Sequence, residues 1–480
     1  MRGLLAATLL AAGASALLSA GCTVGPDYER PTASAPTAWK EAGPWKAAAP
    51  RDAIAKGAWW ELFGDPLLND LEAKAAEANP DLRAAVARVS QARAIARISE
   101  ADFYPTVSLN PSVTRERFSP NRAVQPGSPV KGYTFNDFHV PLDLSYEVDL
   151  WGRVRRSVEA ATAFAEASVA AYETVRLTMH ADVAGAYFAL RAIDADRAVL
   201  LRTLDLRRES LRLAQARLRL GVGNDLDVSR AETELTTTQA ESIGLEKRRA
   251  EVEHALATLT GRPPSELSIP NKPLDLQPPA IPSGLPSELL ERRPDVAEAE
   301  RRMAASNAEI GIATAAYYPA LNLTATAGFE SSDLKHLFDW ESRIWSLGAA
   351  LAAPLYQGGR VDADVERSRA RYEESVAQYR SRLLVAFREV EDGLSSLRVL
   401  SEQAEAQARA VASSRKTADL TTARYNAGLV SYFEVVDAER TVLQNEREAT
   451  LIQGQRLVNS VFLIKALGGG WQDSSLRTGQ

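Results

Sequence analysis

The chain has 480 residues and a formal net charge of −6, with 56 lysines and arginines interspersed among 62 aspartates and glutamates. Charges mixed in this way form no basic patch, which excludes a nucleic-acid partner. One cysteine excludes an intrachain disulfide, and four scattered histidines match neither metal-ligand spacing nor a Ser-His-Asp pattern, so we expect no enzyme activity, no metal and no cofactor.

The N-terminus has the pattern of a secretory signal peptide. Residues 1–21 combine a basic start at Arg2 with an apolar run and end in S-A-G before Cys22. This ending resembles a bacterial lipobox, in which the cysteine is acylated and becomes the first mature residue. Ser19 stands where a lipobox usually has leucine, so an ordinary signal peptide is the alternative. The Ala- and Pro-rich stretch 22–64 is predicted to be a lipid-anchored, extended linker.

A first repeat is predicted over residues 65–262. The pair Asp65-Pro66 is typical of a helix start. In the β-hairpin expected at 105–151, the even positions from 138 to 150 are all apolar, whereas the odd ones include Asp143, Glu147 and Asp149. This alternation predicts strands with one apolar face. They are long enough to cross a bilayer when tilted, although a soluble, half-buried sheet has the same pattern.

The strands lead into a very long helix. Residues 153–220 contain no proline, which predicts one helix of roughly 100 Å. A glycine-rich break near 221–227 follows, and Asn224 is placed to cap a returning helix of 35 residues, 226–260. Because the returning helix covers about half of its partner, we expect the segment 67–103 to stack end to end with it.

The chain is an internal duplication. The motif A-R-L-R-L-G at Ala216 recurs as A-R-Y-N-A-G at Ala423, and Ser431 stands where Asn224 caps in the first copy. The second repeat is predicted over 287–467, with a β-hairpin at 319–357, a last strand within 345–356 and a tip near 428–434. Between the repeats, the proline-dense stretch 263–286 is expected to run outside the helices in an equatorial belt, and 468–480 reads as a frayed tail.

Several motifs together carry a resemblance. They are C-T-V-G-P-D-Y-E-R-P from Cys22, W-W-E-L-F-G-D-P from Trp59, N-P-D-L from Asn79, R-R-P-D-V from Arg292 and the two tips. This combination, which covers essentially all of the mature chain, resembles the TolC-like outer-membrane efflux factors of the lipoprotein branch, the NodT family of RND-type systems. The resemblance implies a mainly α fold with a membrane β-barrel. Three chains would build an α-barrel from long helical hairpins, continuous with a shared twelve-stranded β-barrel of four strands per chain.

The resemblance also implies a location and a function. The protein is expected in the outer membrane, with a periplasmic extension, as the passive exit duct of a tripartite efflux pump for small molecules and drugs. Its partners would be a homotrimer of itself, a periplasmic adaptor (membrane fusion) protein, an inner-membrane RND-type pump and outer-membrane lipid through acylated Cys22. The alternatives are a type I protein-secretion duct and, in a different class, a periplasmic coiled-coil scaffold.

The tips supply the candidate docking and gate residues. Gly221, Val222, Gly428 and Leu429 are expected to meet the adaptor, although a turn needs a glycine in any case. Glu434 and Asp437 are three positions apart in the sequence, which places both on one helix face and predicts a ring of six carboxylates in a trimer.

Each of these gate residues has an alternative role. TolC-like proteins carry aspartates at the constriction where Glu434 and Asp437 fall. The alternative for Glu434 is a capping box with Ser431, in which it serves only the helix end, and the alternative for Asp437 is an interaction with the helix dipole. The resemblance further places Tyr425 and Asp227 at a tyrosine–aspartate latch.

Two further expectations follow from these positions. Val430 replaces an arginine of the family's latch, so we expect a looser closure of the periplasmic end. Asp143, Glu147 and Asp149 would form an acidic lumen face that favours cations. The alternative role of these three carboxylates is solvation of the inner face alone.

Overall fold

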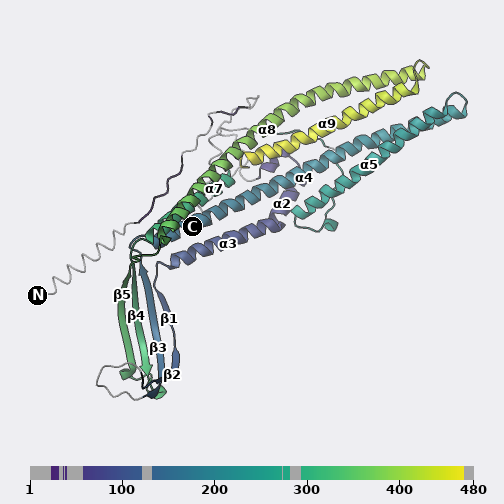
Figure 1. Cartoon of the computed structure of the whole chain (residues 1–480). Helices are drawn as coiled ribbons and strands as arrows, with labels where there is room; N and C mark the ends of the chain where they lie inside the picture. The colour runs from purple at the N-terminus through teal and green to yellow at the C-terminus, as the bar shows by residue number, and fades with distance from the viewer. Residues whose placement is uncertain are drawn as a thin grey trace. The chain divides into compact units, whose positions relative to one another are not determined.

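The computed structural model describes residues 23–31, 36, 38–40, 58–121, 132–272, 274–279, 281 and 293–469 (Figure 1). The predicted signal peptide, Cys22, Arg292 and most of the predicted tail lie outside the described residues. Contacts divide the chain into two units. Unit 1 holds the described residues of Met1–Pro31, Ser90–Ala167 and Glu300–Gln378, and unit 2 holds those of Thr32–Val89, Ser168–Ala299 and Tyr379–Gln480.

Most of the described chain is helical, with one antiparallel sheet. The helices are η1 (Trp59–Phe63), α2 (Pro66–Ala78), α3 (Pro80–Ala101), α4 (Arg153–Arg219), α5 (Asp225–Leu259), η2 (Pro264–Glu266), α7 (Pro294–Ala315), η4 (Leu334–His336), η5 (Trp340–Ser342), α8 (Arg360–Asn426) and α9 (Tyr432–Ala466). The strands are β1 (Thr106–Leu109), β2 (Ser112–Phe118), β3 (Tyr133–Val148), β4 (Ala320–Ser331) and β5 (Arg343–Ala352). None of the described helices is both long and apolar enough to span a membrane.

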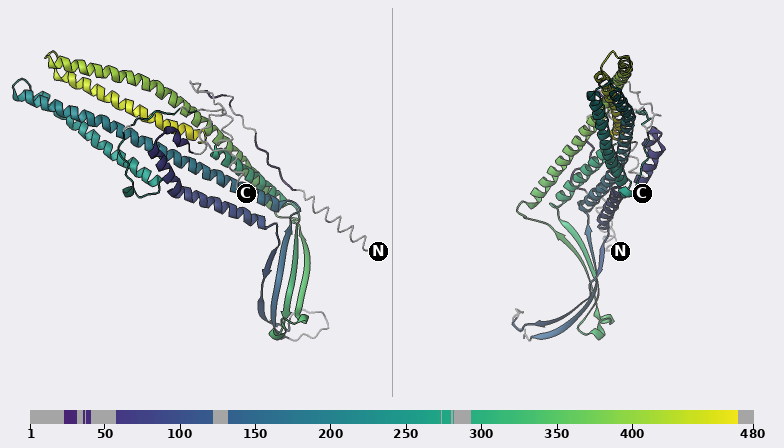
Figure 2. Two further views of the ribbon diagram at one scale, coloured as in Figure 1. Left: turned by 180° about the vertical axis from the view of Figure 1, so that it is seen from behind. Right: turned by 90° about the vertical axis from the view of Figure 1, so that its right-hand side faces the viewer.

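The sheet of unit 1 has the order β1-β3-β4-β5, and β2 continues the line of β1 along β3. The line breaks at Asn110 and Pro111, because proline has no N–H to donate to the ladder. Figure 2 shows the strands side by side in one twisted sheet. The two outer lines of the sheet, β1 with β2 on one side and β5 on the other, pair with no strand on their outer side among the described residues.

Two strand boundaries differ from the expectation. β3 begins at Tyr133 rather than near Phe138, because its first residues pair with β2 and the rings of Phe118 and Tyr133 meet at 5.3 Å. β5 ends at Ala352 rather than near residue 356, since Pro354 cannot donate to a ladder. Pairing with β2 sets the start of β3, and proline sets the end of β5. The alternation of apolar and polar residues along one strand does not predict either boundary.

The first residues after Cys22 pack within unit 1. The Val24 N–H donates to the Trp151 carbonyl oxygen at 3.0 Å, and the Arg156 side chain of α4 pairs with Asp27 at 2.7 Å. Gly25, at φ 90°, lies against Gly311 of α7 so closely that an added Cβ would stand 2.5 Å from the Gly311 Cα. Residues 23–31 are therefore held against α4 and α7, although composition alone predicts an extended linker.

In unit 2 the long helices lie side by side as two hairpins, α4 with α5 and α8 with α9 (Figures 1 and 2). α4 and α8 have 67 residues each, and α5 and α9 have 35 each, as the proline-free runs predicted. Asp65 caps α2 through the Leu67 N–H, and Asn224 caps α5 through the Asp227 N–H, so both predicted caps are confirmed.

The segment 67–103 is two helices rather than one. Asn79 has an extended ψ of 124°, because the ring of Pro80 disfavours a helical residue before it. The Asn79 side chain donates to the Leu259 carbonyl oxygen at 2.8 Å, which joins the end of α5 to the start of α3. At the equivalent joint, Arg293 donates to the Ala466 carbonyl oxygen at 3.1 Å. The returning helices therefore stack end to end with the next ones, as their lengths predicted.

Residues of the W-W-E-L-F-G-D-P motif pack against α4 in unit 2 and hold α2 beside it. The rings of Phe63 and Phe188 meet at 4.7 Å, and the Tyr187 hydroxyl donates to Asp65 at 2.6 Å. Trp60 stacks on His180 with ring centroids 4.2 Å apart. The motif is thus the apolar core of this part of the chain.

Candidate functional site

The tips of both hairpins close in the same way. Gly221 and Gly428 adopt left-handed φ angles of 72° and 75°, which L residues rarely adopt. The Val222 N–H then donates to the Arg217 carbonyl oxygen at 3.0 Å, and Leu429 makes the equivalent bond at 2.9 Å. The side chains of Val222 and Leu429 remain 67% and 69% exposed. The glycines therefore make the turns possible, while Val222 and Leu429 stay exposed at the two tips.

Glu434 and Asp437 both lie on the exposed face at the start of α9. They line one groove of about 500 Å³ between α8 and α9, opposite the hydroxyl groups of Ser413, Thr417 and Thr421. Glu434 also accepts a hydrogen bond from the Ser431 N–H at 3.5 Å, as its alternative role in a capping box predicts. Of the two carboxylates, only Glu434 takes part in the cap of α9, and Asp437 does not.

The proposed latch residues have other partners in this chain. The Arg217 guanidinium lies 4.8 Å from the centre of the Tyr425 ring, and Asp227 accepts a bond from the Asn224 amide at 3.1 Å. Among the described residues no hydrogen bond joins Tyr425 to Asp227. Arg217 was not among the predicted site residues, and its place in the repeated A-R motif was the available signal.

An apolar cluster joins the two hairpins near their tips. Its buried members and the side chains packed on them are Ala214, Ala231, Tyr432, Val435, Val436, Leu211, Val228 and Tyr425. Beside it the Arg230 guanidinium of α5 lies 5.3 Å from the centre of the Phe433 ring of α9. Aromatic and cationic contacts therefore link α4 and α5 to α8 and α9.

Two of the three predicted lumen carboxylates are neutralised at the start of α4. Glu147 binds the Arg153 guanidinium through two bonds of 2.7 Å. Asp149 accepts the first N–H groups of α4 at 3.0 Å and pairs with Arg155 at 3.1 Å. Asp143 is half-buried and accepts hydrogen bonds from Asn110 and from Thr326 of β4. The sequence placed the acids on one face, but the arginines six residues further on were missed.

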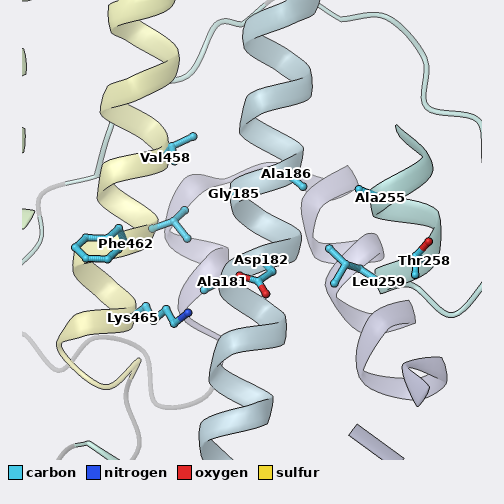
Figure 3. A pocket seen from close by; sticks show the side chains of 11 residues that line it. Ala181, Asp182, Gly185, Ala186, Ala255, Thr258, Leu259, Val458, Phe462 and Lys465 are labelled. Atoms are coloured by element: carbon cyan, nitrogen blue, oxygen red, sulfur yellow. The ribbon is translucent and has the colours of Figure 1, made fainter. Parts of the chain in front are cut away.

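A pocket of about 680 Å³ opens in unit 2 among α4, α5 and α9 (Figure 3). Small and apolar side chains line most of it, while Asp182 of α4 and Lys465 of α9 reach into it (Figure 3). Burial raises the pKa of Asp182, and the charge of Lys465 acts in the opposite direction. The described residues hold no group of three or more His, Cys, Asp or Glu side chains suited to a metal ion.

Most of the chain matches a known family. The family model described as outer membrane efflux protein covers residues 71–262 and 285–469. The chain belongs to the outer membrane efflux protein family.

Curated relatives extend over nearly the full length of this outer-membrane efflux protein. The probable efflux pump outer membrane protein TtgC of Pseudomonas putida is 33% identical over 479 residues, which are 98% of this chain and 97% of the relative. The pyoverdine export outer membrane protein OpmQ of Pseudomonas aeruginosa is 33% identical over 446 residues, or 92% of each chain.

Solved outer-membrane channels share the fold. The channel OprN superposes with a TM-score of 0.87 at 32% identity, covering 94% of this chain and 100% of that one. The Campylobacter jejuni CmeC channel gives a TM-score of 0.89 at 25% identity and covers 94% and 96% of the two chains. This efflux protein is therefore an outer-membrane protein with a mainly helical, periplasmic part, as the resemblance predicted.

Proposed function

We propose that this protein is the exit duct of a tripartite efflux pump and carries small molecules passively from the periplasm to the exterior. The observation that carries the proposal is that the apolar face of the sheet is exposed. In addition, its outermost strands pair with no strand on their outer side among the described residues. Leu347 of β5, for example, is 77% exposed. An exposed apolar band of this kind suits lipid, and open edges suit pairing with further copies.

Closure of the sheet requires more than one chain. Four lines of strand are too few to close a barrel alone. We infer a homotrimer in which the line of β1 and β2 pairs with β5 of a neighbouring copy, giving a shared twelve-stranded β-barrel. The repeats 65–262 and 287–467, with tips near 221–227 and 428–434, would supply the helices of an α-barrel that continues the duct.

The partners follow from the proposed duct. A passive channel needs an energised partner, so we infer an inner-membrane RND-type pump, reached through a periplasmic adaptor protein at the exposed tips, Val222 and Leu429. Relatives include a toluene efflux pump outer membrane protein of Pseudomonas putida, 33% identical, and OpmQ, named for pyoverdine export. These names favour a small-molecule cargo over a secreted protein.

Transport in cells tests the function. Expression with the adaptor and pump of a relative, in a strain that lacks its own exit duct, should restore efflux of a fluorescent dye. Recovery of the purified protein as a water-soluble monomer would reject the duct.

We also propose that Cys22 is acylated. Packing of residues 23–31 against α4 and α7 supports this, since it would hold an N-terminal lipid beside the sheet of the same unit. Mass spectrometry of the mature N-terminus tests it, and an unmodified Cys22 in membrane-extracted protein would contradict it.

A further inference from the structure

One buried charge cluster joins the two hairpins of unit 2. The Arg207 side chain of α4 is 1% exposed. Its Nη1 donates to Oε2 of Glu439 on α9 at 2.7 Å, and its Nη2 lies 3.4 Å from Oε2 of Glu234 on α5. Arg440 of α9 pairs with the other oxygen of Glu234. A single guanidinium therefore contacts carboxylates from two other helices, one in each hairpin.

Glu439 depends on Arg207 for its contact with a cation, whereas Glu234 also pairs with Arg440. Glu234 and Glu439 are 9% and 25% exposed. Burial raises the pKa of Glu439, while the charge of Arg207 acts to lower it. Removal of the cation from a buried ion pair is strongly destabilising, because it leaves an uncompensated charge in a place with little water. Loss of Arg207 should therefore separate α9 from α4 at this level.

The cluster also sets the rotation of α9 about its own axis. Tyr432, Val435 and Val436 are buried on the side of α9 that carries Glu439. At about 100° per residue, Glu434 and Asp437 fall on the opposite side of the helix, and both are exposed. Whatever holds Glu439 toward α4 therefore turns Asp437 away from the first hairpin.

We propose that Arg207 is a positioning residue of the periplasmic gate. Through Glu439 it holds α9 at the rotation in which Asp437 faces the groove rather than the first hairpin. This inference rests on the proposed duct with Asp437 at its narrow end. Its new content is that the narrow end is held by a buried arginine 230 residues away in the chain from the gate carboxylate it aims.

Single-channel recording of purified trimers in planar bilayers tests the proposal. Arg207→Met should increase conductance and weaken block by a trivalent cation at least about fivefold, the size of a modest coupling between two sites. Arg207→Lys keeps the charge and should restore much of the block. The exchange Arg207→Glu with Glu439→Arg should do the same, since it rebuilds the pair with reversed signs.

Arg191→Met is the matched control. Arg191 is a second buried arginine of α4, 1% exposed, which binds Asp194 and the Pro270 carbonyl oxygen instead of α9. It should lower trimer stability but leave cation block unchanged. Equal changes of block in Arg207→Met and Arg191→Met would overturn the inference, as would wild-type block in Arg207→Met.

Two further outcomes distinguish a failure of the proposed duct from a failure of the role assigned to Arg207. A wild-type protein without conductance would reject the proposed duct itself, and with it the gate. If Arg207→Met does not assemble, Arg207→Lys decides. Wild-type conductance in the lysine variant supports a charge requirement, and the conductance of Arg207→Lys with Glu439→Gln must then rise. No rise in that double variant would overturn the proposal.

Discussion

Glu72 and His180 form a buried pair that shares one proton. The Glu72 carboxyl lies 2.7 Å from Nδ1 of His180, and Trp60 covers the imidazole ring. Burial raises the pKa of Glu72 to about 9 and lowers the pKa of His180 to about 4. Both shifts favour the neutral form of the group, because burial penalises the charged form.

This pair predicts a stability that depends on pH. Because the folded pKa of Glu72 is raised, its contribution is full below the unfolded value of 4.5 and is lost as the pH rises toward 9. Glu72→Gln keeps a donor toward His180 without titrating. The variant should gain on the wild type by up to about 1.4 kcal/mol per pH unit across this window.

Thermal melting of the purified protein at pH 5, 7 and 9 measures the difference in stability between the two proteins. The gain should be close to zero at pH 5 and largest at pH 9. His180 acts in the opposite direction, losing stability as the pH falls from 6.5 toward 4, so pH 5 marks the lower limit of the comparison. Glu77→Gln, on the exposed side of α2, is the control and should show no trend. Equal melting of wild type and Glu72→Gln at pH 9 would contradict the assignment.

Substitutions should distinguish the roles of the two proposed gate carboxylates, Glu434 and Asp437. Asp437→Asn removes one charge from an exposed site that caps nothing, so cation block of the channel should weaken while trimer stability stays within about 0.5 kcal/mol. Glu434→Gln keeps an acceptor for the Ser431 N–H and tests the second charge without loss of the cap. Single-channel block by a trivalent cation is the measurement. Unchanged block in Asp437→Asn would remove Asp437 from the gate.

Contacts between residues close in sequence were the features that the sequence predicted best. The caps at Asp65 and Asn224 follow from short side chains before a helix, which act within three residues. Partners brought from other helices were not predictable in this way. Arg217 under Tyr425 and Arg207 between Glu234 and Glu439 depend on how the helices pack, which the spacing of charges along one helix does not record.

At the scale of helices, glycines mark where two long helices touch. A Cβ on Gly454 of α9 would stand 2.5 Å from the Cβ of Ala192 on α4, whereas a Cβ on Gly244 of α5 would meet nothing within 4 Å. Gly454→Ala should therefore destabilise by about 1–3 kcal/mol through overpacking. Gly244→Ala should stabilise by up to about 1 kcal/mol through helix propensity.

The pair is measured by thermal melting of both variants in the same detergent. Opposite signs are expected, since the two substitutions add the same methyl group and differ only in their neighbours. A stabilising Gly454→Ala would show that α4 and α9 move apart at no cost.

Helix lengths were predictable, and strand ends were not. A run without proline sets the extent of α4 and α8, because nothing else in those segments breaks a helix. The break at Asn79 was present in the sequence as Pro80 and was passed over in favour of one segment. The start of β3 at Tyr133 depends on pairing with β2, which no single run of residues reveals.

For the whole molecule, the exposed apolar face of the sheet predicts where membrane insertion is sensitive. Leu347→Arg would place a charge on that face and should cost about 2–4 kcal/mol if the residue lies near the centre of the bilayer. Ser346→Arg is the matched control one residue away, on the face shared with Asp143 and Thr326. Heat-modifiable trimer migration in detergent gives the folded fraction. Equal assembly of the two variants would show that this face does not meet lipid.

The duplication made the overall plan readable from the sequence, because each repeat supplied a check on the other. Trimer formation and the partners rest on surfaces that a single chain leaves open. They therefore enter as proposals that the experiments above address.

The packing of residues 23–31 against α4 and α7 has a consequence for the order of folding. The Pro26 carbonyl oxygen accepts a bond from Asn307, a contact that spans 281 residues. Synthesis runs from the N-terminus, so this segment can contact Trp151 and Arg156 of the first repeat before its contacts with α7 of the second repeat can form. Such a long loop closes late in folding. Residues 23–31 therefore complete their contacts late, and a chain interrupted within the first repeat would lack those that they make with α7.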